Sequence, residues 1–234
     1  LGFSGDTYEC RDRRSGDHVV VKILPKPLFV ESFPQHRHLV RMLDSGDFWG
    51  QAFAVTEFIR GQSLDDLLAG RGGLAPAEAL NYFAQICNGL SALHARGLEH
   101  GDVKPSNILI GEANVLKLAG YGEGVSSSSV STRTRGYMAP EVAAGGAPSS
   151  ASDVYSAGLV LRELFGGRVP DDLLPLVERC LHVDPSLRYP SALDLLPTGA
   201  LEGVSVQSPA GARPLTAFIS DDPSDIRTAV PLME

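Results

Sequence analysis

The chain has 234 residues, 43% of them apolar and 21% charged, which is enough to bury a core in one two-lobed domain or in one domain with a tail. A formal net charge of −8 argues against nucleic acid or an anionic membrane surface as the main partner. The three cysteines are far apart and form neither a disulfide framework nor a metal-ligand cluster, so we expect a reducing, cytoplasmic setting. No apolar run reaches the roughly 20 residues that cross a bilayer. The first residue is not Met, and we expect a segment of a longer protein.

The first 59 residues predict strands and turns. Two runs rich in β-branched residues, VVVKIL over 19–24 and AFAVTEFI over 52–59, are typical of strands. Pro25, Pro27 and Pro34 lie between them and leave no room for a long helix.

The pattern becomes helical from Pro76 onward. Apolar residues recur at steps of three and four over 77–93, which predicts an amphipathic helix that begins at Pro76 and ends near Gly97. We expect further helices over 153–165 and 171–182. Strands followed by helices indicate an α+β chain.

The string HGDVKPSNILI, residues 100–110, carries a carboxylate, an ammonium group and an amide in one loop between a helix and an apolar strand. In such a loop Asp102 could lie beside a hydroxyl group and Lys104 beside a phosphate. The alternative is a polar turn in which Asp102 and Asn107 cap local backbone groups.

This string resembles the catalytic loop of protein kinases, HRDLKPENIL, and on this match and four others the chain is identified as a member of the protein kinase superfamily, Ser/Thr type. The other matches occur in the family's order: the hinge at 61–64 (GQSL), the end of the activation segment at 137–141 (YMAPE), the anchoring helix at 152–164 (SDVYSAGLVLREL) and the closing segment at 184–192 (DPSLRYPSA), whose Arg188 would pair with Glu141.

The resemblance implies an α+β, two-lobed protein-kinase-like fold over residues 1–196. A small β-rich N-lobe would span about 1–57, and a larger helical C-lobe would span about 61–196. Residues 197–234 have no sustained period and are rich in Pro, Ser, Gly, Ala and Asp, so we expect a flexible tail or linker.

The resemblance also implies catalytic roles. Asp102 matches the acceptor of the substrate hydroxyl proton, and Lys104 matches the residue that contacts the transferred phosphate. Asn107 matches a magnesium ligand, and Thr134 matches the threonine that braces the catalytic aspartate.

A second set of matches implies ATP as the ligand. Lys22 matches the lysine that grips the α- and β-phosphates, although in isolation it could be a solvated lysine at a strand end. Gly2 belongs to the glycine-rich loop, and Thr56 lies at the gatekeeper position. The backbone C=O of Glu57 and the N–H of Ile59 match the groups that meet the adenine edge.

The metal site departs from the family pattern. Gly120, Tyr121 and Gly122 occupy the place of Asp-Phe-Gly, and Gly120 lies eighteen positions after Asp102, where the magnesium-binding aspartate belongs. The metal therefore loses its principal anionic ligand, and we expect weak or absent magnesium binding, with the neutral Asn107 as the remaining ligand. Glu123 could substitute only after a local backbone rearrangement.

The phosphate loop departs as well. Ser4 and Thr7 stand where the family has glycine, which limits how closely backbone N–H groups approach phosphates. Glu9 occupies the place of an apolar residue over the adenine, unless a one-residue slip puts Cys10 there. Gly101 replaces an arginine, so activation by loop phosphorylation is not expected.

Two helices of the family are shortened. Thirteen residues separate Lys22 from His36, too few for a complete αC helix, and Glu31 is the only acidic candidate to pair with Lys22. The stretch from Phe165 to Leu173 is likewise too short for a full αG helix. Either both helices are truly absent or the chain omits parts of them.

These departures favour a pseudokinase, a signalling or scaffold module that binds a protein partner and binds ATP weakly without magnesium. The alternative is a slow or metal-independent Ser/Thr kinase that transfers the γ-phosphate of ATP to a protein hydroxyl. A third possibility, a small-molecule phosphotransferase, is disfavoured by YMAPE and SDVYS. The Ala- and Gly-rich composition is typical of a bacterial signalling protein.

Overall fold

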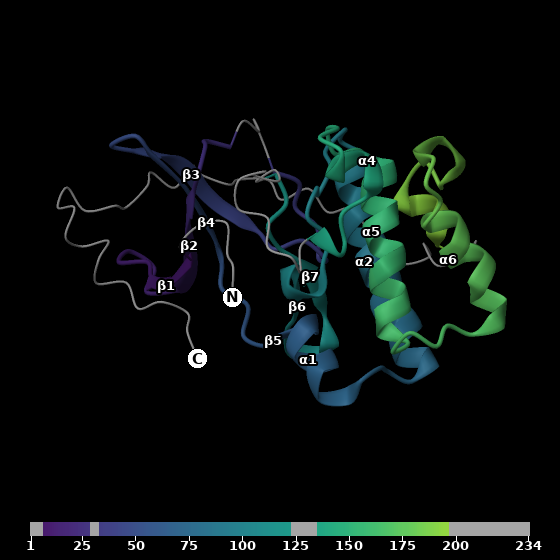
Figure 1. Cartoon of the computed structure of the whole chain (residues 1–234). Coiled ribbons are helices and arrows are strands. Elements are labelled where there is room, and N and C mark those ends of the chain that lie inside the picture. The colour runs from purple at the N-terminus through teal and green to yellow at the C-terminus, as the bar shows by residue number, and fades with distance from the viewer. Residues whose placement is uncertain (1–6, 29–32, 123–134, 197–234) are drawn as a thin grey trace.

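The computed structural model describes residues 7–28, 33–122 and 135–196. A strand-rich lobe lies beside a larger helical lobe, and the chain passes from one to the other after β4 (Figure 1). The two-lobed α+β fold is confirmed. The predicted tail at 197–234 lies outside the described residues.

The N-lobe is a four-stranded antiparallel sheet with the order β1-β2-β4-β3. The two runs predicted as strands form its central strands, where β-branched side chains pack on both neighbours. The bounds are β1 Thr7–Arg11, β2 His18–Leu24, β3 Met42–Phe48 and β4 Gln51–Glu57.

The inner face of this sheet is defined by strand register. Lys22 and Val20 lie two residues apart on β2 and therefore share a face. Glu9 lies directly opposite Val20 on β1, and Thr56 lies opposite Val20 on β4, so all four share that face. Cys10 pairs with Val19 and points to the other face, which excludes the alternative that Cys10 takes the place over the adenine.

No helix occurs among residues 25–28 and 33–41, the described part of the connection from β2 to β3. The shortened αC region is thus confirmed for these residues. A small apolar cluster covers the inner face instead, built from Leu24, Ala52 and Ala54 with Leu28 and Met42 packed against it.

The C-lobe is built around α2, which begins at Pro76 as predicted and ends at His94. Its apolar face is fully buried at Ile86, Leu90 and Leu93. Burying each such side chain contributes about 1.5–3 kcal/mol relative to an exposed one. The helices are α1 Leu64–Arg71, α2 Pro76–His94, α4 Pro140–Ala143, α5 Ser150–Leu164 and α6 Leu174–Cys180.

Short elements complete the C-lobe. A three-stranded antiparallel sheet, β5-β6-β7, lies between the N-lobe sheet and α2 (Figure 1). The strands are β5 Gln62–Ser63, β6 Ile108–Ile110 and β7 Leu116–Leu118. The 3-10 helices are η1 Pro105–Asn107, η2 Glu112–Asn114, η3 Asp171–Leu173, η4 Pro185–Leu187 and η5 Ala192–Leu195.

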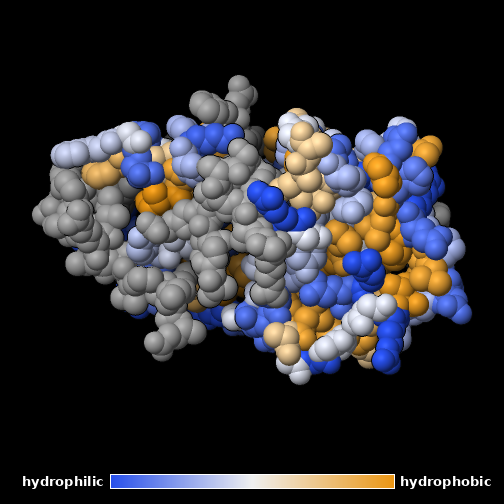
Figure 2. Space-filling view, viewed as in Figure 1, coloured by the Kyte–Doolittle hydropathy of each residue, from blue (hydrophilic) through white to orange (hydrophobic). Residues whose placement is uncertain are grey.

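The connection from α5 to α6 is short. Among residues 165–173 the only helical piece is the 3-10 turn η3, which confirms the shortened αG region. Apolar surface is visible over α5 and α6 in Figure 2. In the C-lobe, Leu174, Val183, Leu187 and Leu193 are exposed. Among the described residues, no helix has the length and apolar character needed to cross a membrane.

Gly61 sets how closely the connection between the lobes approaches β6. A Cβ atom at Gly61 would lie 1.9 Å from the carbonyl oxygen of Ile110, a separation that real atoms cannot adopt. Only glycine lets this connection pass over β6 without displacing it.

We predict that Gly61→Ala lowers the free energy of unfolding by about 1–3 kcal/mol, because the added methyl group must push the chain off β6. The matched control is Gly70→Ala in α1, where an added Cβ meets nothing within 4 Å. That substitution should raise stability by about 0.5–1 kcal/mol, since alanine favours helix. Urea unfolding of both variants decides the matter, and equal stabilities would contradict the close approach.

Candidate nucleotide and catalytic site

Three of the four predicted catalytic residues, Asp102, Lys104 and Asn107, meet in one hydrogen-bonded group between α2 and β6. Oδ2 of Asp102 accepts hydrogen bonds from Nζ of Lys104 at 2.6 Å and from Nδ2 of Asn107 at 2.8 Å. The same Nδ2 also donates to the backbone oxygen of Asp102 at 2.8 Å. The carboxylate therefore has a fixed orientation and a cation beside it.

Asp153, at the start of α5, holds the backbone of this loop. Its side chain is buried and accepts hydrogen bonds from the backbone N–H groups of His100 at 2.8 Å and Gly101 at 2.9 Å. Nε2 of His94 lies 3.0 Å from the same carboxylate. Because the N–H of Ala192 donates to Nδ1 of His94, the proton of His94 must lie on Nε2 and point at Asp153.

Gly120 lies beside Asn107, as the spacing predicted. The backbone N–H of Ala119 donates to the backbone oxygen of Asn107 at 2.8 Å. A Cβ atom at Gly120 would lie 3.4 Å from Nδ2 and 3.8 Å from Oδ1 of Asn107. A side chain at this position would thus reach the amide that matches a magnesium ligand, and glycine supplies none.

Tyr121 anchors the segment that follows. Its ring is buried and packs edge-on against His100 and Phe33, with ring centroids 6.3 and 6.1 Å apart. Its hydroxyl group donates to the carbonyl oxygen of Val40 at 2.6 Å. Burial, with a smaller contribution from the charge of Glu57, raises the pKa of Tyr121, so the hydroxyl keeps its proton.

The segment before β3 pairs with β7 and carries Val40 to this place. The carbonyl oxygen of His38 accepts from the N–H of Leu118 at 2.9 Å, and the N–H of Val40 donates to the oxygen of Leu118 at 2.8 Å. Burial lowers the pKa of His38 to about 4, and its neutral ring donates from Nδ1 to the oxygen of Leu116 at 2.9 Å. A Cβ at Gly89 would lie 2.8 Å from the His38 oxygen, so this approach also requires glycine.

The hinge residue Glu57 ties β4 to β7. Its Oε1 accepts hydrogen bonds from Nζ of Lys117 at 2.5 Å and from the backbone N–H of Arg41 at 2.8 Å. Thr56 lies on the inner face of the sheet, and Ile59 is half-buried just after β4. The adenine contacts assigned to the backbone of Glu57 and Ile59 stay predictions.

Of the other predicted site residues, the structure describes Lys22 but not four further ones. Lys22 lies on the inner face of β2, in the same lobe as Thr56. Gly2, Thr134, Glu31 and Glu123 lie outside the described residues.

The side chains at the metal position do not fit magnesium. Magnesium prefers carboxylate oxygens with near-octahedral geometry, whereas Asn107 offers one neutral amide oxygen and Gly120 offers nothing. Among residues 7–28, 33–122 and 135–196, no group of three His, Cys, Asp or Glu side chains could hold a metal ion.

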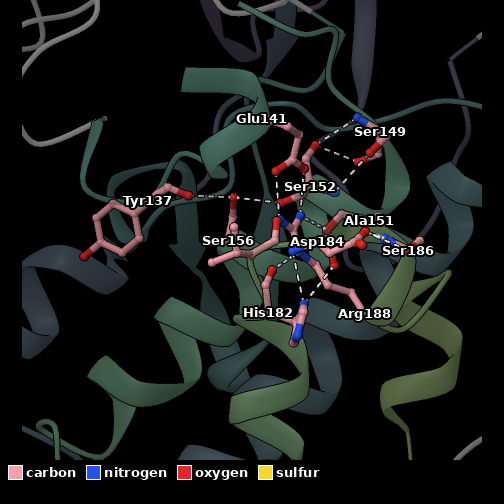
Figure 3. Close-up of polar contacts among 11 residues, drawn as sticks. Tyr137, Glu141, Ser149, Ala151, Ser152, Ser156, His182, Asp184, Ser186 and Arg188 are labelled. Atoms are coloured by element: carbon pink, nitrogen blue, oxygen red, sulfur yellow. Dashed lines mark hydrogen bonds and ion pairs between the residues drawn. The ribbon is translucent and has the colours of Figure 1, made fainter. Parts of the chain in front are cut away.

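Arg188 lies among polar side chains of the C-lobe and points toward Glu141 (Figure 3). Its guanidinium group is buried and binds Glu141 through two hydrogen bonds of 2.7 Å, which confirms the pair that the sequence predicted. It also donates to the carbonyl oxygens of His182, Ala151 and Val183. The hydrogen bonds from Arg188 lower the pKa of Glu141, so the pair remains charged at neutral pH.

We predict that Arg188→Ala destabilises the domain by about 3–5 kcal/mol, because it leaves Glu141 and three carbonyl oxygens without their donor. The control is Arg162→Ala on the exposed side of α5, which should change stability by less than about 0.5 kcal/mol. Urea unfolding measures both, and a loss below 1 kcal/mol at Arg188 would show that the pair is not structural.

Comparison with known proteins agrees with this geometry. The family description "Protein kinase domain" matches residues 1–173, and the chain belongs to the protein kinase family. It is 29% identical over 210 residues to the probable serine/threonine-protein kinase pknA2 of Bifidobacterium longum, covering 78% of this chain and 28% of that protein. It is 35% identical over 144 residues to the serine/threonine-protein kinase PrkC of Bacillus subtilis, covering 58% of this chain and 22% of that protein.

A third relative, the serine/threonine-protein kinase PknL of Mycobacterium tuberculosis, is 35% identical over 159 residues, covering 64% of this chain and 40% of that protein. The chain therefore spans less than half the length of each of these three relatives.

Proposed function

We propose that this chain is a pseudokinase domain, a bacterial, cytoplasmic signalling or scaffold module that acts by binding a protein partner. In this proposal ATP or ADP binds weakly and without magnesium. The observation that carries it is Gly120, whose Cβ position lies 3.4 Å from Asn107 and which leaves the metal position without a carboxylate. Metal bridging supplies several kcal/mol of transition-state stabilisation in phosphoryl transfer, and the described side chains do not replace it.

Asp102 holds the loop in shape whether or not the domain transfers phosphate. A general base must reach the proton of the substrate hydroxyl group. Oδ2 of Asp102 accepts from Nζ of Lys104 and from Nδ2 of Asn107, and these bonds do not use Oδ1 of Asn107, the atom that could bind a metal ion.

The N-lobe supports the proposal of weak nucleotide binding. In an active kinase a glutamate on αC orients the lysine that grips the phosphates. Residues 25–28 and 33–41 form no helix that could carry such a glutamate. Lys22 keeps the positive charge that attracts phosphate, which supports weak binding of a nucleotide.

A slow or metal-independent Ser/Thr kinase is the second candidate. It is favoured by the retention of Asp102, Lys104 and Asn107 in one hydrogen-bonded group, and by the similarity to bacterial proteins named serine/threonine kinases. Its substrate would be a hydroxyl group of a protein. The phosphotransfer assay described below separates the two candidates.

We predict that Gly120→Asp restores magnesium-dependent nucleotide binding but not phosphotransfer. Gly120 has φ +81°, a region that aspartate tolerates better than most residues, and the new carboxylate would face Asn107. Nucleotide affinity in this variant should rise at least tenfold on adding magnesium, about 1.4 kcal/mol. The matched control is Gly122→Asp, which adds the same charge at a glycine with φ +78° and should show no such gain.

Phosphotransfer is measured with radiolabelled ATP and a basic protein substrate for the natural chain, Gly120→Asp and Asp102→Asn. The proposal expects all three to give the same background signal. Transfer by the natural chain that Asp102→Asn abolishes would establish the second candidate. Strong transfer by Gly120→Asp alone would show that Gly120 is the main cause of the lost activity.

A further inference from the structure

Three polar side chains, Glu9, His18 and Arg11, form a hydrogen-bonded chain on the inner face of β1 and β2. Nδ1 of His18 lies 2.5 Å from Oε1 of Glu9, and Nη2 of Arg11 lies 3.2 Å from Nε2 of His18. Arg11 lies directly opposite His18 across the β1–β2 ladder, and Glu9 lies opposite Val20. All these side chains share the face that carries Lys22.

The chemistry of the three groups fixes where the proton of His18 lies. A guanidinium group has donors only, so Nε2 of His18 must accept the hydrogen bond from Arg11. Nδ1 therefore carries the proton and donates a hydrogen bond to Oε1 of Glu9. His18 thus lies between the two charged side chains, and the guanidinium group of Arg11 bonds to His18 and not to Glu9.

In the proposed nucleotide pocket Glu9 would lie over the base, and we call this side of the pocket its roof. Across three strands, Glu9, Val20 and Thr56 form one row on the inner face, and Thr56 matches the gatekeeper behind the nucleotide. The ring of His18 lies 5.8 Å from the ring of Phe58, which stands between the hinge residues Glu57 and Ile59. His18 thus lies between Phe58, beside the predicted hinge, and Glu9 on the edge strand β1.

We propose that Glu9 is a specificity-determining residue that disfavours nucleotides in this pocket. The inference rests on the proposed nucleotide pocket. The face of an aromatic ring carries partial negative charge, so a purine stacked under a carboxylate is repelled by it. The side chains of His18 and Glu9 are 35% and 34% exposed, and a base beneath them would remove water that now solvates the charge.

The same roof defines what the pocket accepts more readily. A flat ligand without phosphates, carrying a positive charge or amino groups on its ring, would gain from the carboxylate what a nucleotide loses. The weak ATP binding proposed above then has two separate causes: the missing carboxylate at Gly120 weakens metal-assisted binding, and the extra carboxylate of Glu9 weakens binding of the base itself.

The test is calorimetric titration of ADP into the natural chain, Glu9→Val and Glu9→Gln, all in EDTA. Without metal, the result does not depend on Gly120 or on whether the domain transfers phosphate, so this inference and the proposed function can fail separately. Glu9→Val should bind ADP at least tenfold more tightly than the natural chain, and Glu9→Gln, which keeps the shape and removes the charge, at least threefold more tightly.

The matched control is Asp17→Asn in the turn of the same hairpin, which removes one negative charge outside the row and should leave ADP affinity unchanged. Affinity in Glu9→Val that is equal to or weaker than that of the natural chain would overturn the inference, as would an equal gain in Asp17→Asn. If thermal melting shows that Glu9→Val does not fold, Glu9→Gln decides alone, and no gain there overturns the inference.

Discussion

The buried carboxylate of Asp153 is the constraint on which the site depends. It accepts the backbone N–H groups of His100 and Gly101 and faces Nε2 of His94, so one side chain joins α2, α5 and the catalytic loop. Leaving these donors unpaired in the core would cost about 1–3 kcal/mol each. Asp153 thereby holds the backbone of the two residues directly before Asp102, whose own side chain is oriented by Lys104 and Asn107.

The protein has the two-lobed fold of its family, and it differs from the family pattern in the charged side chains at Gly120 and Glu9. Asn107 and Gly120 lie side by side, and in the proposed function the absence of a side chain at Gly120 weakens metal binding. Glu9 lies opposite Val20 on the inner face of the sheet, and in the inference above its carboxylate disfavours a nucleotide. Tyr121 keeps the glycine-flanked segment in place through its hydroxyl group and the oxygen of Val40. The shape of the site is thus stabilised independently of its chemistry.

The sequence predicted the parts of the fold that have strong periods or long motifs. The β-branched run of β2 and the three-and-four spacing of α2 are such signals, and the pair of Arg188 and Glu141 followed from the motif order. Helix α1 was missed, because eight residues carry little periodicity, although Ser63 and Asp66 form a capping box that marks its start. The role of Asp153 was also missed, since a polar residue in the first turn of a helix is ordinary and its partners lie more than 50 residues away. Tertiary contacts of that kind leave no local pattern.

The loss of the metal carboxylate at Gly120 is the central claim, and the magnesium dependence of nucleotide binding tests it most directly. ATP is titrated into the natural chain by calorimetry, once with magnesium and once with EDTA, and Lys22→Met serves to show that binding occurs at the proposed pocket. The account predicts equal affinities in the two conditions, both weakened by Lys22→Met. A tenfold or larger gain from magnesium, about 1.4 kcal/mol, would contradict it, because such a gain requires an anionic metal ligand in the pocket.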